Sequence, residues 1–143
     1  MMQYSSSVDL GVSKEHVLPY VSDLSQYLLW MPLIHGVEPL GEGVWKVELR
    51  AKVGVFARSK QLTMVRTTQT DDRLVFERHE DDGRTHAPWT MEVALADTPH
   101  GCTVTIHLTY GGNLWTAGVL DKILAHQVDL GKKSLAELVA HSL

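Results

Sequence analysis

Cysteine, aromatic residues and long apolar runs are all scarce in this sequence. Cys102 is the single cysteine, and phenylalanine, tyrosine and tryptophan make up 7% of the 143 residues. One cysteine forms no intrachain disulfide, which excludes a disulfide-stapled secreted domain and favours a reducing compartment. No apolar run reaches about 18 residues, and residues 1–7 have neither the basic nor the apolar region of a signal peptide. We therefore expect a cytoplasmic protein with no integral membrane segment.

Positive charge is also in short supply. The chain has 13 lysines and arginines against 17 aspartates and glutamates, giving a net charge of −4, and the basic residues are scattered. Proteins that bind nucleic acid by neutralising phosphates carry a concentrated basic patch. We therefore expect no nucleic-acid partner.

What the sequence does contain is the composition of one globular domain. It is 44% hydrophobic and 21% charged, which excludes intrinsic disorder, and its length matches one domain core. A chain of this mass buries roughly two-thirds of its surface on folding. We therefore expect a single domain over residues 1–143, with room for a sizeable core or an internal cavity.

Apolar and polar residues alternate with a period of two through the middle of the chain. The clearest example runs from Trp45 to Val53, where every second residue is apolar. Such alternation is typical of a strand with one face in water. The pattern predicts six antiparallel strands between about residue 37 and Tyr110, with a hairpin turn at the Asp-Gly pair of residues 82–83.

Shorter signals precede these strands. Residues 4–12 predict a first strand, and Ser13 after it is a good N-cap for a helix. Pro19 lies inside that helix and is expected to kink it or to move its start later, because proline has no backbone N–H. A second short helix is predicted over residues 25–30.

A long terminal helix is predicted from Asn113 almost to the end of the chain, because apolar residues recur there with helical spacing. About 28 residues would span roughly 40 Å, enough to cross a sheet. A sheet with one apolar face has to cover that face, and this helix is the only predicted element long enough. The expected fold is α+β: a strand, two short helices, six strands, then a helix gripped by the curved sheet. The candidate site lies between sheet and helix.

Two short motifs give this order a family resemblance. The first is Asp23-Leu24 followed by Tyr27 and by Trp30-Met31-Pro32, and the second is Tyr110-Gly111-Gly112 before the last helix. With the element order, they resemble the START-like superfamily, also described as polyketide cyclase/dehydrase-like or helix-grip proteins, over essentially the whole chain. The resemblance implies a cavity for a hydrophobic or aromatic small molecule. It implies no particular reaction, because members include lipid carriers, ligand-sensing domains, coenzyme-Q-binding proteins, cyclases and hydrolases.

Strand and helix phase select the residues expected to line that cavity. An apolar lining with a few polar groups is typical of small-molecule pockets, although each residue alone could equally be an ordinary part of the core. The expected ligand-binding residues are Phe76, Arg78, Trp89, Met91, Ile106, Leu108, Tyr110, Leu120 and Leu124.

Arg78 is the most informative of these residues because it continues the inward phase of Leu74 and Phe76. A buried guanidinium is costly unless it is paired. Three outcomes stay open: Arg78 pairs with an internal acid, it binds an anionic or carbonyl group of a ligand, or a bulge turns it into solvent. Arg58 and Lys60 share the phase of the next strand in the same way.

The sequence offers few groups for catalysis. Among eight histidines, His79 and His86 are the best placed for acid–base chemistry, with Arg78 as a possible partner. Adjacent residues of a strand face opposite sides, so Arg78 and His79 cannot both point inward without a bulge. Cys102 shares the phase of buried residues and is expected to be an inert thiol. Neither the histidine spacing nor the glycines predict a metal site or a cofactor.

The leading hypothesis is therefore the binding or carriage of a hydrophobic, lipid-like or aromatic molecule, with Arg78 and Tyr110 fixing any polar end. An aromatase/cyclase-like enzyme acting on polyketide-type substrates is the alternative. A third hypothesis is a protein-binding module that presents an apolar patch at residues 31–34. The sequence does not specify the ligand or the oligomeric state.

Overall fold

The computed structural model describes residues 2–53, 56–111 and 117–142. They form seven strands and three helices. The strands are β1 (Met2–Leu10), β2 (Ile34–Gly41), β3 (Val44–Val53), β4 (Phe56–Gln69), β5 (Arg73–Arg78), β6 (Trp89–Thr98) and β7 (Gly101–Tyr110). The helices are α1 (Lys14–Val21), the 3₁₀ helix η1 (Leu24–Leu29) and α2 (Ala117–His141). Asn113, the expected cap of the last helix, lies outside the described residues.

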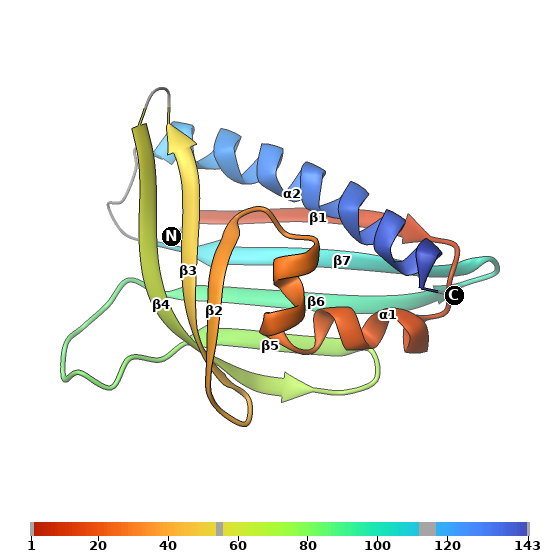
Figure 1. The fold of residues 1–143 in the computed structure, drawn as a ribbon, viewed down its shortest axis with the longest axis horizontal. Helices are drawn as coiled ribbons and strands as arrows, with labels where there is room; N and C mark the ends of the chain where they lie inside the picture. The colour runs from red at the N-terminus through yellow and green to blue at the C-terminus, as the bar shows by residue number, and fades with distance from the viewer. Residues whose placement is uncertain (1, 54–55, 112–116, 143) are drawn as a thin grey trace.

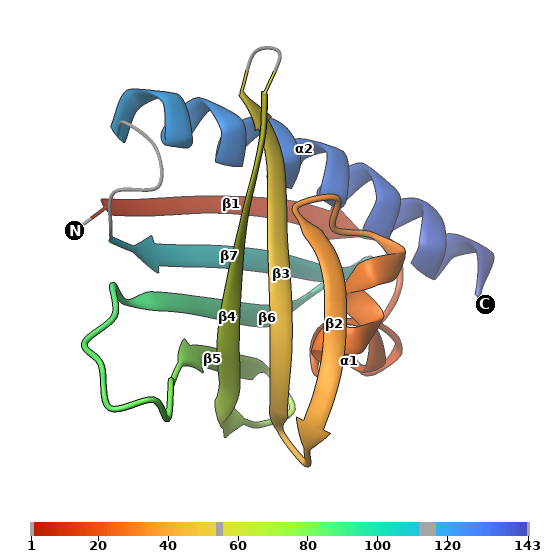
Figure 2. The same cartoon turned by 60° about the vertical axis from the view of Figure 1, so that its left-hand side comes forward.

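All seven strands join one antiparallel sheet in the order β1-β7-β6-β5-β4-β3-β2. Figures 1 and 2 show that β2, β3 and β4 run at a steep angle to the other strands, so the sheet curves strongly. A register shift between Arg66 and Thr68 lies in β4 where it pairs with β5, and such bulges bend a strand. The curved sheet and the long helix α2 across it confirm the predicted α+β helix-grip fold.

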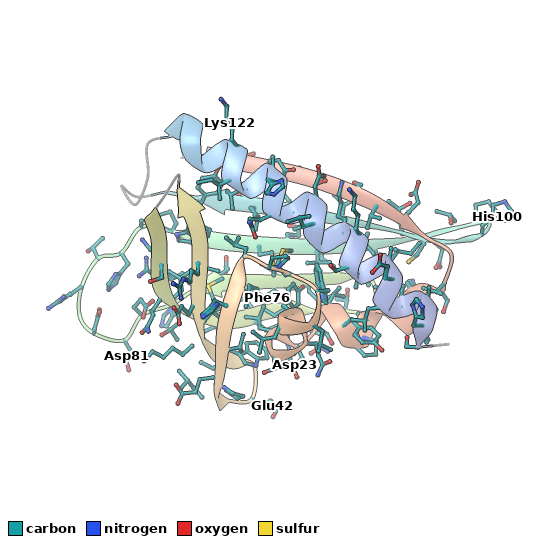
Figure 3. All side chains as sticks on the ribbon, turned by 45° about the horizontal axis from the view of Figure 1, so that its top comes forward. Asp23, Glu42, Phe76, Asp81, His100 and Lys122 are labelled. Atoms are coloured by element: carbon teal, nitrogen blue, oxygen red, sulfur yellow. The ribbon has the colours of Figure 1, made fainter. Side chains whose placement is uncertain are left out.

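The concave face of the sheet is apolar because its strands alternate as the sequence predicts. In β7, every second residue from Cys102 to Tyr110 is buried, and the residues between them are half-buried. The facing residues of β6 follow the same phase, so that Met91 lies opposite Leu108. Figure 3 shows Phe76 in the middle of the molecule.

Neither α1 nor α2 has, within the described residues, the length and apolarity that a membrane span requires.

The helix α1 begins where Ser13 predicts, and Pro19 does not move its start. Pro19 lies in the second half of an eight-residue helix. The carbonyl of Ser13 accepts hydrogen bonds from the backbone N–H groups of His16 and Val17. The first turn therefore forms upstream of Pro19, and the proline removes only a donor near the end of the helix.

The tight hairpin predicted at residues 82–83 is wrong. β5 ends at Arg78 and β6 begins at Trp89, and residues 79–88 form a loop instead of strands. Gly83 does adopt the positive φ of 71° that a turn needs, so the Asp-Gly pair makes a turn inside a longer loop. Arg78 donates side-chain hydrogen bonds to three residues of this loop, and these bonds fix the loop instead of the backbone hydrogen bonds of a hairpin.

One end of the concave face is a closed aromatic cluster, which we call the packed end. Tyr27 lies 4.6 Å from Trp30 and 6.1 Å from Phe76 between ring centroids, and Trp45 lies 5.8 Å from Phe76. The polar atoms of this cluster have partners: the Tyr27 hydroxyl donates to Val21 O at 2.8 Å, and Trp30 Nε1 donates to Tyr20 O at 3.0 Å. The short helices α1 and η1 are thereby fixed to the sheet.

Candidate functional site

An interior cavity of about 50 Å³ lies between the sheet, the segment from η1 to β2, and α2. Every residue that lines it is hydrophobic. The lining comes from the sheet, from η1 and the segment that follows it, and from α2. The lining residues are Leu24, Met31, Leu33, Ile34, Val47, Leu49, Leu62, Met64, Trp89, Met91, Leu108 and Val128.

The volume of the cavity limits what it holds without rearrangement. Pockets for small organic ligands measure roughly 300–1,000 Å³, so 50 Å³ is room for only a part of such a molecule. Three of the lining residues are methionines, Met31, Met64 and Met91. Their unbranched thioether chains change shape at little cost. The cavity can therefore enlarge by side-chain movement around a ligand.

The expected ligand-binding residues fall into two groups. Trp89, Met91 and Leu108 line the interior cavity. The remaining expected residues form the second group. Phe76, Ile106, Tyr110 and Leu124 are buried without lining the cavity, Arg78 lines a separate groove, and the side chain of Leu120 lies outside the described residues.

The apolar patch proposed for residues 31–34 is wrong. Met31, Leu33 and Ile34 are 4%, 6% and 8% exposed, and all three line the cavity. The segment is covered by α2, which approaches closely at Gly131: a Cβ there would lie 3.1 Å from Met31 Sδ. A glycine on the apolar face of the last helix was the sequence signal for this close approach. The exposed leucines in this region are Leu28 and Leu29 instead.

Trp89 is the one cavity-lining residue with a nitrogen in its side chain. The residue is 5% exposed and its ring stacks on Tyr110, with 5.4 Å between centroids. Its indole Nε1–H is buried, and no acceptor for it lies within hydrogen-bond distance among the described residues. A buried donor without an acceptor costs about 1–3 kcal/mol. The indole N–H of Trp89 is therefore a buried donor without an acceptor among the described residues, and Trp89 itself lines the apolar cavity.

Arg78 points inward, as its phase predicts, and pairs with an internal acid. Its side chain is 8% exposed. It donates to Glu80 Oε1 at 3.0 Å, to Ala87 O at 3.1 Å and to His86 Nδ1 at 3.2 Å. Burial alone would raise the pKa of Glu80, but hydrogen bonds from Thr63 N and from the Arg78 guanidinium outweigh it and hold that pKa below its usual value. Arg78 thus ties residues 79–88 to the sheet.

His86 continues this network toward the surface. Arginine can only donate, so the Nδ1 atom that faces Arg78 must be an acceptor. The proton of a neutral ring then lies on Nε2, which donates to the Asp82 carboxylate at 2.8 Å. A backbone hydrogen bond from Arg84 and the contact with His86 lower the pKa of Asp82. Both ring nitrogens of His86 are therefore engaged within the protein.

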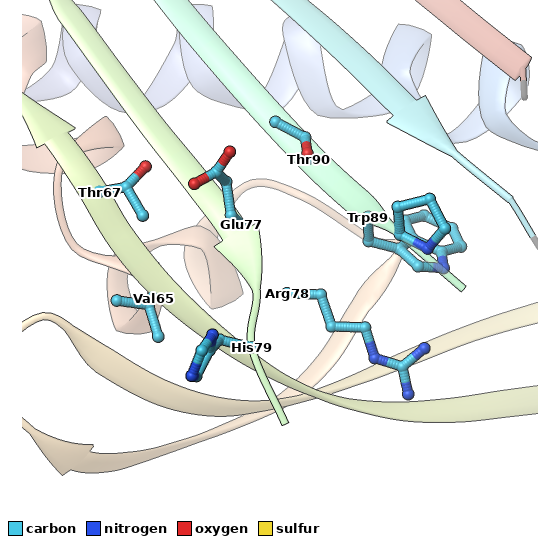
Figure 4. A pocket seen from close by; sticks show the side chains of 8 residues that line it. Val65, Thr67, Glu77, Arg78, His79, Trp89 and Thr90 are labelled. Carbon is cyan, nitrogen blue, oxygen red and sulfur yellow. The ribbon is translucent and has the colours of Figure 1, made fainter. Parts of the chain in front are cut away.

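A second hollow, an open groove of about 450 Å³, lies where β4, β5 and β6 meet the loop of residues 79–88. Figure 4 shows that Arg78 extends toward Trp89, away from Glu77 and His79. His79 is exposed and contributes to this groove, not to the interior cavity. Arg78 lines the same groove, but its side chain is 8% exposed whereas His79 is exposed, as expected for neighbouring residues on opposite faces of a strand.

Lys60 lies on the same face of β4 as Leu62 and Met64, and it is half-buried. Desolvation by burial and the positive charge of Arg78 lower its pKa. No carboxylate lies within 4 Å of its ammonium among the described residues. The side chain of Arg58 lies outside the described residues. Sequence phase placed Lys60 inward, but its lack of an acidic partner depends on the three-dimensional arrangement.

Cys102 is fully buried, in agreement with its inward phase. Burial is the main cause that raises the pKa of its thiol, and the nearby charges of Asp97 and Glu15 add to it. A thiol held in its neutral form is a poor nucleophile, so Cys102 belongs to the core.

Comparison with known proteins agrees with this architecture. The sequence profile of the family described as "Polyketide cyclase / dehydrase and lipid transport" matches residues 1–142. No curated protein matches the chain in sequence. A START superfamily protein from Mycobacterium smegmatis is similar in structure with 14% identity and a TM-score of 0.75, over 99% of each chain. A conserved protein from Geobacillus kaustophilus reaches a TM-score of 0.77 with 15% identity, over 99% of this chain and 97% of that one.

The structural neighbours share the fold with this chain, but at 14% and 15% sequence identity they give no information about its ligand. The family match, by contrast, spans nearly the whole chain, and the curved sheet around α2 is the architecture that the resemblance implied. The chain belongs to the polyketide cyclase / dehydrase and lipid transport family and has the helix-grip fold of the START superfamily.

Proposed function

We propose that this protein binds an apolar small molecule in the interior cavity between the sheet and α2. The observation that carries the proposal is a void lined only by hydrophobic residues, one of which, Trp89, has a buried indole N–H without an acceptor among the described residues. A well-packed core leaves few such voids and few such donors. Three methionines in the wall give the cavity the means to adapt to its occupant.

Arg78 has a different role in this proposal from the one the sequence suggested. Its guanidinium already donates to Glu80, Ala87 and His86. We assign it to holding residues 79–88 against the sheet. Three of its five N–H donors are used in these contacts.

The cyclase-like enzyme is the second interpretation, and the description of the family is compatible with it. Acid–base catalysis needs a titrating group within hydrogen-bond reach of the substrate. His79 faces the outer groove, and both nitrogens of His86 are engaged by Arg78 and Asp82. This arrangement favours binding over catalysis at the interior cavity.

The test is the binding of a neutral apolar probe, 1-decanol, by isothermal titration calorimetry. We expect saturable one-to-one binding to the unaltered protein. We expect a loss of at least tenfold in the Val47→Phe variant, because the added ring fills the cavity that Val47 lines. Leu40→Phe is the control, since Leu40 is 52% exposed and does not line the cavity. Equal affinity in both variants, with cooperative unfolding of each, would place decanol elsewhere and overturn the proposal.

A further inference from the structure

The loop of residues 79–88 is held to the sheet at both of its ends by one side chain. Arg78 of β5 donates to Glu80 Oε1 at 3.0 Å and to Ala87 O at 3.1 Å. Burial opposes the charge of Glu80, but hydrogen bonds from Thr63 and Arg78 outweigh it and hold the pKa of this carboxyl below its usual value of 4.5. Glu80 therefore keeps its charge in mild acid, and the ends of the loop stay anchored there.

The middle of the loop, residues 81–86, reaches the sheet at a single point. We call these residues the loop tip. Arg78 Nη2 donates to His86 Nδ1 at 3.2 Å. Among the hydrogen bonds and ion pairs of the described residues, this is the one that joins the loop tip to a strand, because the others that involve the tip stay within it. The position of the tip therefore depends on the state of the His86 ring.

A proton on His86 Nδ1 is incompatible with this hydrogen bond. The guanidinium of Arg78 has only donors, so Nδ1 has to accept with its lone pair. An imidazolium has an N–H on both ring nitrogens, and its Nδ1–H would point at a donor that carries the same sign of charge. Lys60 of β4 adds positive charge on this side, since burial and the charge of Arg78 lower the pKa of Lys60.

The acid that faces His86 belongs to the loop tip itself. Asp82 accepts from His86 Nε2 at 2.8 Å and from the backbone N–H of Arg84 at 3.0 Å. The other acid of the network, Glu80, is bonded to Arg78. The pair of Asp82 and His86 is kept whether or not the tip contacts Arg78, so it favours the imidazolium in both positions. Arg78 disfavours the imidazolium in only one of them, and a proton therefore shifts the tip away from Arg78.

We propose that residues 79–88 form a pH-sensitive strap, whose tip leaves Arg78 when His86 takes up a proton while Glu80 and Ala87 keep the two ends in place. Histidine is the side chain that ordinarily changes its charge between pH 5 and 8. Because Arg78 lines the outer groove, release of the tip leaves one more of its N–H donors free beside that groove. The strap requires no ligand in the interior cavity, so it stands or falls apart from the proposed function.

NMR of the 15N-labelled full chain at pH 7.5 and pH 5.5 tests the strap. At pH 7.5, the ring nitrogen shifts of His86 should show a neutral ring with its proton on Nε2, and the backbone order parameters of residues 81–86 should be about 0.85, the value of rigid backbone. At pH 5.5, we expect the imidazolium and order parameters below about 0.6 in the tip. Glu80 and Ala87 should stay rigid at both pH values.

Three variants separate His86 from other groups that titrate. His86→Gln removes the titrating ring, so its loop tip should have the same order parameters at both pH values. His79→Gln is the matched control, because His79 is an exposed histidine of the same loop and accepts none of the hydrogen bonds from Arg78; it should keep the response. Asp82→Asn should move the release of the tip to lower pH, since the imidazolium loses its acidic partner.

Several results would overturn the strap. One is a loop tip that keeps its order while His86 takes up its proton, and another is a pH response that survives His86→Gln. Loss of order at Glu80 and Ala87 together with the tip would mean that the whole loop detaches, against the assigned anchors. An imidazolium at His86 in an ordered loop at pH 7.5 would show that Nδ1 is not the acceptor for Arg78.

Discussion

Two buried tryptophans, Trp30 at the packed end and Trp89 at the interior cavity, differ in how their indole N–H groups are satisfied. At the packed end, Trp30 Nε1 donates to Tyr20 O, and Arg66 donates to Ser22 O at 2.6 Å while it lies 5.5 Å above the ring of Trp45. Trp89 Nε1, by contrast, has no acceptor in the described residues. The packed end therefore satisfies its indole N–H within the protein, whereas the N–H of Trp89 is unsatisfied among the described residues.

This difference shows how stability and function are divided within one layer of side chains. A polar group with a protein partner contributes to the folded state. A polar group without one costs stability and is retained where something else uses it. The following changes test this division, beginning with the largest expected effect.

Phe76→Ala should destabilise the protein most, because Phe76 is fully buried at the packed end between Tyr27 and Trp45. Removal of a buried phenyl ring costs about 3–5 kcal/mol. The free energy of unfolding in urea measures the loss. Leu40→Ala, at a site 52% exposed, should cost less than about 0.5 kcal/mol. Similar losses in both variants would contradict the packed end as the centre of the core.

Glu80→Gln should cost about 1.5–3 kcal/mol at neutral pH, the range for hydrogen bonds to a charged group. Glu80 accepts from Arg78 and from Thr63 N. Its pKa in the folded state lies below the ordinary value of 4.5, so its charge stabilises the fold above that pH, and the contribution disappears as the pH falls through the folded pKa. The two proteins should therefore converge in stability in acid. Urea unfolding from pH 7 to pH 3 measures this, and a constant gap would contradict it.

A pair of matched substitutions compares the two tryptophans directly. Trp30→Phe and Trp89→Phe remove the same atoms from side chains that are 2% and 5% exposed. Trp30 loses a hydrogen bond and Trp89 loses none, so Trp30→Phe should be more destabilising by about 1 kcal/mol. Thermal and urea unfolding of the ligand-free proteins measure the difference. Equal losses would mean that Trp89 Nε1 has a partner in solution.

Lys60→Met should raise the stability of the ligand-free protein slightly at pH 7, because the penalty on a partly exposed charge is reduced by solvent screening. Burial and Arg78 lower the pKa of Lys60 below 10.5. The folded state therefore disfavours the charged lysine, and this penalty shrinks as the pH rises from the folded pKa toward the unfolded value. The gain should accordingly diminish in alkali. Lys46→Met, at an exposed position, should show no such gain, and a loss of stability in Lys60→Met would contradict the uncompensated charge.

The sequence predicted the architecture because its patterns are local. The alternation through β3, β6 and β7 assigned each side chain to a face of the sheet, and the burial of those strands follows it. Arg78 was placed inward by the same rule, which the side-chain exposure of 8% confirms. These predictions need only the geometry of a strand.

The details of the site were beyond such rules because they depend on contacts between distant segments. The loop at residues 79–88 is held by Arg78, Glu80 and His86 instead of by the predicted hairpin. The apolar residues 31–34 are buried because Gly131, about a hundred residues later in the chain, lets α2 approach them. A glycine on the apolar face of the last helix signals a close approach, but only the tertiary structure shows that residues 31–34 are the segment that packs there.

By itself, the sequence determined the order of the elements, the face on which each strand residue lies and the family to which the chain belongs. The tertiary structure alone decided the volume of the interior cavity, the partners of Arg78 and the absence of partners for Lys60 and Trp89 Nε1 within the described residues. The physical reason is the separation along the chain between the residues that determine each feature. Periodicity is fixed by the neighbouring bonds of the chain, whereas a void or an unpaired charge is the difference between what a site needs and what all the surrounding segments supply.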